Sequence, residues 1–149
     1  MSEVCQKAEE FLTEILSDLR FDLQVSSEFT DEGCVLNLSG QDTPLLLGEN
    51  GEMLDAFETL LFQIYGRDLD RSQRFVCDAE GFRQTRKVEL QAMARFAAQN
   101  VRKNDRPFTF GILNSTERRV IHLTLQGESD LVTESVGVGR DRRLQVRLK

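Results

Sequence analysis

The chain has 149 residues, 40% of them hydrophobic and 30% charged, and a formal net charge of -6. This length allows one ordinary domain or two small domains that share an interface. No run approaches the roughly 18 apolar residues of a membrane span, and the first residues lack the basic leader and apolar core of a signal peptide, so we expect a cytoplasmic protein without membrane insertion.

Cysteine and histidine are scarce. The three cysteines, Cys5, Cys34 and Cys77, are odd in number and widely spaced, a pattern that indicates neither a disulfide framework nor a zinc cluster. With one histidine and no CxxC motif the chain offers little for a metal site, and we predict no metal and no cofactor.

Charge is divided unevenly between the two halves of the chain. Residues 1–70 contain 3 Lys and Arg against 16 Asp and Glu, a net charge of -13, whereas residues 71–149 contain 16 against 9, a net charge of +7. The difference favours two units, of which the second suits a polyanion. Electrostatic attraction between the two halves is another explanation, and both can hold.

The acidic half begins with an amphipathic helix. Apolar residues at i, i+3 and i+4 spacing predict a helix over residues 3–19. Alternation at 21–25 and 34–38 then predicts two strands, with a turn at 30–33. The change from helical to strand periodicity indicates an α+β fold.

A pair of glycines follows. Within residues 45–56, Gly48 and Gly51 stand at GxxG spacing, before a helix marked by Phe57 and Ile64. Such glycines frame a tight turn whose backbone N–H groups stand at a helix N-terminus, where a phosphate can bind. Alone, the spacing is a weak signal, because glycines occur in many loops. Residues 74–78 then predict a third strand.

The basic half opens with a long predicted helix that starts near residue 78 and ends near residue 103, with Leu90 and Val101 in its buried stripe. Extended backwards, this stripe passes through three basic residues, Arg83, Arg86 and Lys87. These side chains therefore emerge beyond the edge of the core. They suit either a path for phosphates or ion pairs with the acidic half.

The only histidine, His122, lies four residues after Arg118. Asn114 and Glu117 are the N-cap and capping-box residues of a predicted helix. That helix places Arg118 and His122 on one face, toward solvent, where they and Arg119 offer donors to a phosphate oxygen. Two alternatives stay open: residues 120–125 also alternate like a strand, and His122 can cap or pack against a neighbouring element.

Two further strands are predicted at residues 131–136 and 144–148. The loop between them can bend at Gly137 and Gly139. It is rich in arginine, and we expect these side chains beside Arg118 and His122. The arginines are Arg140, Arg142 and Arg143.

The first half, residues 1–78, resembles a K-homology (KH) domain of the second type, because helix, two strands, GxxG, helix and strand follow in that order. In that family the GxxG loop binds the backbone of single-stranded nucleic acid, a role that the resemblance gives to Gly48 and Gly51. The family loop usually includes a basic residue, but here its middle residues are Glu49 and Asn50. A carboxylate beside a phosphate weakens binding, so a purely structural turn is the other interpretation.

The second half, residues 79–149, resembles the R-three-H domain, which is named for its Arg-three-residues-His spacing and known for binding single-stranded nucleic acid. The matching residues are 117–122 and 133–135, followed by Gly137, Gly139 and Arg143. Arg118 and His122 match the named pair. A KH domain followed by an R-three-H domain resembles the bacterial Jag family, also called SpoIIIJ-associated proteins.

The resemblance implies a small cytoplasmic regulator that binds single-stranded RNA, or single-stranded DNA, and has protein partners in cell envelope growth or division. The N-terminal segment of many Jag relatives is expected to be absent. Base stacking is expected to be limited, because the chain has no Trp and one Tyr and most Phe residues stand at core-like spacing.

The alternative function is a protein–protein adaptor, which the acidic half and the acidic GENG loop favour. An enzyme is not predicted, since the sequence offers no triad partners for its histidine, no ligand cluster and no GxxxxGK[ST] motif.

Overall fold

The computed structural model describes residues 3–149, apart from the side chain of Glu49, and it divides into two compact units. The first is Met1–Arg83 and the second is Gln84–Lys149. Each unit combines helices with one three-stranded sheet, in agreement with the predicted α+β class. Within the described residues, none of the helices combines the length and the apolar character needed to cross a lipid bilayer.

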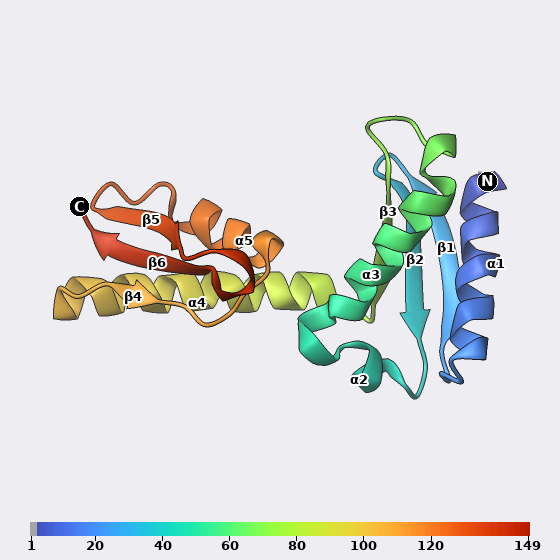
Figure 1. The fold of residues 1–149 in the computed structure, drawn as a ribbon, viewed down its shortest axis with the longest axis horizontal. Helices are drawn as coiled ribbons and strands as arrows, with labels where there is room; N and C mark the ends of the chain where they lie inside the picture. The colour runs from blue at the N-terminus through green and yellow to red at the C-terminus, as the bar shows by residue number, and fades with distance from the viewer. Residues whose placement is uncertain (1–2) are drawn as a thin grey trace. The chain divides into compact units, whose positions relative to one another are not determined.

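The first unit is a three-stranded sheet with helices on it. Its elements are α1 (Glu3–Asp18), β1 (Gln24–Thr30), β2 (Gly33–Ser39), α2 (Thr43–Leu46), α3 (Gly48–Tyr65), the 3-10 turn η1 (Gly66–Asp68) and β3 (Arg74–Ala79). The strand order is β1-β2-β3, with β1 antiparallel and β3 parallel to β2. α1 packs on β1 and α3 packs on β3, as Figure 1 shows.

Helical and strand periodicity explain the core of this unit. α1 buries Ala8, Leu12 and Leu16 at i, i+4 spacing, and α3 buries Leu54, Phe57 and Leu61 at i, i+3 and i+4 spacing. The first strand differs from the prediction of residues 21–25, because β1 begins at Gln24 and continues through polar residues to Thr30. Pairing with β2 decides its extent, and a polar strand at the edge of a sheet needs little apolar alternation.

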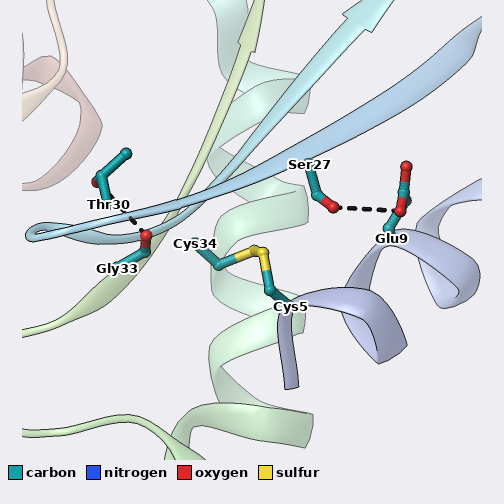
Figure 2. The surroundings of a disulfide bond; sticks show 6 residues. All are labelled: Cys5, Glu9, Ser27, Thr30, Gly33 and Cys34. Carbon is teal, nitrogen blue, oxygen red and sulfur yellow. Dashed lines mark hydrogen bonds between the residues drawn. A yellow bond between two sulfur atoms is a disulfide. The ribbon is translucent and has the colours of Figure 1, made fainter. Parts of the chain in front are cut away.

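Two cysteines that the sequence analysis left unpaired form a disulfide bond. Cys5 of α1 and Cys34 of β2 are joined across the core of the first unit, and neither is exposed (Figure 2). Ser27 of β1 also donates a 3.1 Å hydrogen bond to Glu9 of α1. The expectation of no disulfide was wrong because spacing along the chain says nothing about two residues that packing brings together. The third cysteine, Cys77 of β3, is a buried free thiol.

The second unit has two helices on one face of a second three-stranded sheet. Its elements are the remainder of α4 (Phe82–Asn104), β4 (Phe108–Thr109), α5 (Ser115–Leu125), β5 (Leu131–Val136), the 3-10 turn η2 (Gly139–Asp141) and β6 (Arg143–Leu148). The antiparallel strands stand in the order β4-β6-β5, so β4 and β5 are opposite edges. α4 runs along this sheet (Figure 1).

Alanines on α4 fill the centre of the second core. Ala94, Ala97 and Ala98 are buried between Leu90 and Val101, and they share the core with Ile121 of α5 and Val146 of β6, among others. Because protein interiors are densely packed, the small alanine side chains let the axis of α4 lie close to the strands. The order of helix, helix, strand and strand predicted for this half is confirmed, and the structure has the short β4 between the two helices.

Thiol counting tests the disulfide. Burial raises the pKa of the Cys77 thiol to about 12, so at pH 8 only about one thiol in 10,000 is ionised in the folded protein. We expect no reaction with an aromatic disulfide reagent in the native state. One thiol per chain should react after unfolding in denaturant without reductant, and three after reduction. Three reactive thiols in the unfolded, unreduced chain would contradict the Cys5–Cys34 bond.

Candidate nucleic-acid interface

The helix that holds the Arg-three-residues-His pair begins as the sequence predicts. The side chain of Asn114 accepts a 2.8 Å hydrogen bond from the Glu117 N–H, and Glu117 Oε1 accepts one of 3.2 Å from the Asn114 N–H. This reciprocal capping box satisfies two N–H groups that the first helical turn leaves open. α5 is therefore a helix at residues 115–125, and the alternative of a strand at 120–125 is excluded.

Glu117 has a second partner that the sequence did not reveal. Its carboxylate is buried, and Oε2 accepts a 2.8 Å hydrogen bond from Arg86 Nε on α4. Burial works to lower the pKa of the Arg86 guanidinium, but hydrogen bonds to Glu117 and Glu89 outweigh burial and raise it. Arg86 is therefore a cation that holds α5 on α4 and is paired with two carboxylates, Glu117 and Glu89.

Arg118 and His122 lie one turn apart on the outer side of α5. Arg118 is half-buried, and its Nη1 donates a 2.6 Å hydrogen bond to the Leu113 carbonyl just before the helix. His122 is exposed, and its Nδ1 shares a hydrogen bond with the Thr133 hydroxyl of β5. Both expectations for this histidine thus hold, since it faces solvent and also contacts a neighbouring strand. The bond at Nδ1 leaves Nε2 directed away from Thr133.

An open cleft of 540 Å³ lies between α5, β5 and the start of β6. Its basic lining is Arg118, Arg119, His122 and Arg142, and its other lining residues are Ser115, Thr133, Glu134, Ser135 and Leu144. Over residues 3–149, leaving aside the side chain of Glu49, these arginines form no ion pair with a carboxylate. The cleft thus combines available guanidinium groups, an imidazole and hydroxyl groups, which we call the basic cleft.

Only part of the arginine-rich loop reaches the basic cleft. Arg142 lines it, whereas Arg140 in η2 and Arg143 at the start of β6 are exposed outside it. The one carboxylate in the lining, Glu134, accepts a 3.2 Å hydrogen bond from Arg147 Nε. Arg147 therefore offsets the negative charge that Glu134 would otherwise present to an anion. The pairing of β5 with β6 brings Thr133, Glu134 and Ser135 to the basic cleft. In the sequence, these residues were part of the resemblance to the R-three-H domain.

Arg83 takes the second of its two predicted roles, ion pairing with the acidic half. Its Nη2 lies 3.0 Å from Asp55 Oδ1 and 2.8 Å from Glu58 Oε2, both on α3. Its Nε also donates to the Cys77 carbonyl at 2.7 Å. Burial raises the pKa of Glu58, although the Cys77 N–H and Arg83 act against that shift. Lys87, by contrast, is exposed and outside the basic cleft.

The GxxG segment lies at the N-terminal end of α3. Asn50 and Gly51 have left-handed φ values of 58° and 79°, so the predicted tight turn is present within the helix bounds. A Cβ on Gly51 would stand 2.4 Å from Cε1 of Phe82, so close packing and the left-handed φ both favour glycine there. Gly48 has open space around it. The side chain of Glu49, on which the charge of this turn partly depends, lies outside the described residues.

Known proteins resemble both the second unit and the chain as a whole. Residues 88–148 match the family model of the R-three-H domain. Three relatives, each named RNA-binding protein KhpB, cover most of the chain. That of Clostridium symbiosum is 30% identical over 145 residues, that of Bacillus subtilis (strain 168) 29% over 146, and that of Lactiplantibacillus plantarum 23% over 141.

These alignments cover 96%, 97% and 94% of this chain, and 65%, 70% and 44% of the respective relatives. Residues 88–148 are therefore similar to an R-three-H domain. All four basic residues of the basic cleft lie within the matched residues, whereas Arg83, Arg86 and Lys87 precede them. Helix α5 presents Arg118 and His122 together with two further lining residues, and β5, β6 and Arg142 supply the rest of the lining.

The capping box should contribute measurably to stability. Asn114→Ala removes one cap and should lower the free energy of unfolding by about 1 kcal/mol. Glu117→Ala removes a cap and also leaves the Arg86 guanidinium without its buried partner, so it should cost about 3 kcal/mol. Urea denaturation of the two variants measures the difference. Thr116→Ala, an exposed change in the same turn, is the matched control, and equal effects of all three would contradict this account.

Proposed function

We propose that this chain binds single-stranded nucleic acid, RNA foremost, through the basic cleft. The observation that carries the proposal is the convergence of Arg118, Arg119 and Arg142 with His122 at one open surface, with no carboxylate paired to those arginines among the described residues. Guanidinium groups donate in forked pairs that match phosphate oxygens. The proposal is for binding and not for catalysis.

The other lining residues suit a ribose-phosphate chain. The hydroxyl groups of Ser115, Thr133 and Ser135 are donors and acceptors of the kind that contact sugar and phosphate oxygens. A 2′-hydroxyl can use both functions, which is how a protein distinguishes RNA from DNA. An open cleft, unlike a closed pocket, admits a chain that continues in both directions.

The comparisons support RNA as the ligand. The three relatives are named for RNA binding, and the R-three-H family is known for binding single-stranded nucleic acid. We extend that property to this chain as a proposal, because the chain spans about two thirds or less of the length of two of the three relatives. A cytoplasmic location, membership of the Jag family and a role in envelope growth or division belong to the same proposal.

For the first unit we propose a type II KH assignment and a supporting role. Its order of helix, two strands, two helices and a strand, with β3 parallel to β2, supports the assignment. Counted from Met1 to Arg83, this unit has 6 Lys and Arg against 18 Asp and Glu, a net charge of -12. The Phe82 ring packs against Gly51, and Arg83 forms ion pairs with carboxylates of α3. These features favour a scaffold over a second phosphate site.

The salt dependence of RNA binding tests the basic cleft. Arg119→Gln combined with Arg142→Gln should weaken binding of a fluorescent single-stranded RNA about tenfold per arginine. Each phosphate contact on a single strand contributes about -0.7 to the slope of log K against log salt, so the slope should become about 1.4 units shallower. Fluorescence anisotropy at several salt concentrations measures both quantities.

The matched control is Arg102→Gln, which removes one positive charge from an exposed arginine of the same unit. Arg102 is paired with Asp130 at 2.7 Å and Glu128 at 2.9 Å, so it should not contact RNA. Because the cleft variant removes two positive charges and the control removes one, equal losses of affinity per charge removed would show that only net charge matters. Recovery of proteins but no RNA with the chain from nuclease-free extract would favour the protein–protein adaptor instead.

A further inference from the structure

An aromatic side chain stands open on the long helix of the second unit. Phe96 of α4 is 60% exposed, although the buried stripe of this helix runs through the neighbouring alanines. Exposing a phenyl ring to water forgoes the stabilisation that burial would bring. Phe96 also lies outside the lining of the basic cleft. Its position is therefore not explained by the core or by the proposed phosphate site.

Phe96 is held in place by a chain of aromatic contacts. Its ring lies 6.2 Å from that of Phe108 on β4, at an interplanar angle of 83°. Phe108 in turn lies 5.1 Å from Phe110, which is buried in the core. Edge-to-face contacts of this kind fix the rings without covering their outer surfaces. We call Phe96 and Phe108 the aromatic pair, and it is a partly open surface connected to the core through Phe110.

The charges beside the aromatic pair suit a polyanion. Lys103 follows Phe96 by seven residues, two turns along the same side of α4, and Arg106 lies two residues before Phe108. Both are exposed, and in the part of the chain that the structure describes neither is paired with a carboxylate. Asp105, between them, is the acidic residue of this turn. From Gln84 to Lys149 the unit has 13 Lys and Arg against 7 Asp and Glu, a net charge of +6.

We propose that the aromatic pair is a stacking platform for bases of single-stranded RNA, with Lys103 and Arg106 contacting the adjoining phosphates. Rings beside unpaired cations are the combination by which proteins bind single strands without reading their sequence. The platform lies at the β4 edge of the sheet and the basic cleft at the β5 edge, so the two are separate contacts on one unit. This inference rests on the proposed RNA-binding function and adds base contact, which the sequence had suggested to be limited.

Fluorescence offers a direct test because the chain has no tryptophan. In the full chain carrying Phe96→Trp, the new indole is the single tryptophan emitter, and stacking of a base on it should quench its emission as a uridine 12-mer is added. Phe62→Trp is the matched control, because Phe62 is 58% exposed but belongs to α3 of the first unit. Strong quenching in the first variant and little in the second would support the platform. Equal or absent quenching in both, with RNA bound, would overturn it.

Affinity measurements separate base stacking from backbone contact. Phe96→Leu keeps an apolar side chain but removes the ring, and it should weaken binding of the uridine 12-mer roughly 5- to 150-fold. Binding of an abasic 12-mer, which has the same phosphates and no bases, should be unchanged by this substitution. Circular dichroism would confirm that the variant is folded. An equal loss for both oligomers would mean that Phe96 acts on the fold or on phosphates, and it would overturn the proposal.

The outcomes also distinguish this inference from the proposed function. If Arg119→Gln with Arg142→Gln weakens binding while Phe96→Leu leaves it unchanged, the basic cleft stands and the platform falls. If the unmodified chain binds no single-stranded RNA even at low salt, both proposals are overturned together.

Discussion

The carboxylate of Glu117 connects the local and tertiary structure of the second unit. One oxygen accepts the Asn114 N–H and completes the start of α5, and the other accepts from Arg86 on α4. Because the group is buried, both contacts are made away from bulk water, where an unpaired charge would be costly. Together with the buried Ile121 and Leu125, this side chain holds α5 in place, and α5 carries Arg118 and His122.

The arginines of this protein fall into two groups according to their partners. One group, Arg83, Arg86 and Arg102, forms ion pairs with carboxylates of neighbouring elements, and these arginines act as structural cations. The arginines of the basic cleft have no such partner within the described residues. Net charge alone does not separate the groups, since an ion-paired arginine has already given its donors to a carboxylate. A phosphate could bind the second group without having to displace a carboxylate.

The roles of Gly51 and of the three cysteines depend on their neighbours in the folded structure. Gly51, at the end of the GxxG segment, leaves the space that the Phe82 ring occupies. Cys5 and Cys34 join α1 to β2, whereas Cys77 stays a buried thiol near Glu58 and Arg83. In each case the neighbour that explains the residue lies at least 29 residues away or on another element. The GxxG spacing therefore predicted the turn but not the packing of Gly51 against Phe82.

Much of the fold followed from the sequence, because helix periodicity, the capping box at Asn114 and strand alternation at residues 131–136 and 144–148 are local properties. The R-three-H pair on a helical face was predictable for the same reason. Tertiary structure alone decided the Cys5–Cys34 bond, the capture of Arg83 and Arg86, the union of Arg142 with α5, and the open ring of Phe96 beside Phe108. These depend on distances between residues far apart in the chain, which are set only when the helices and sheets pack together.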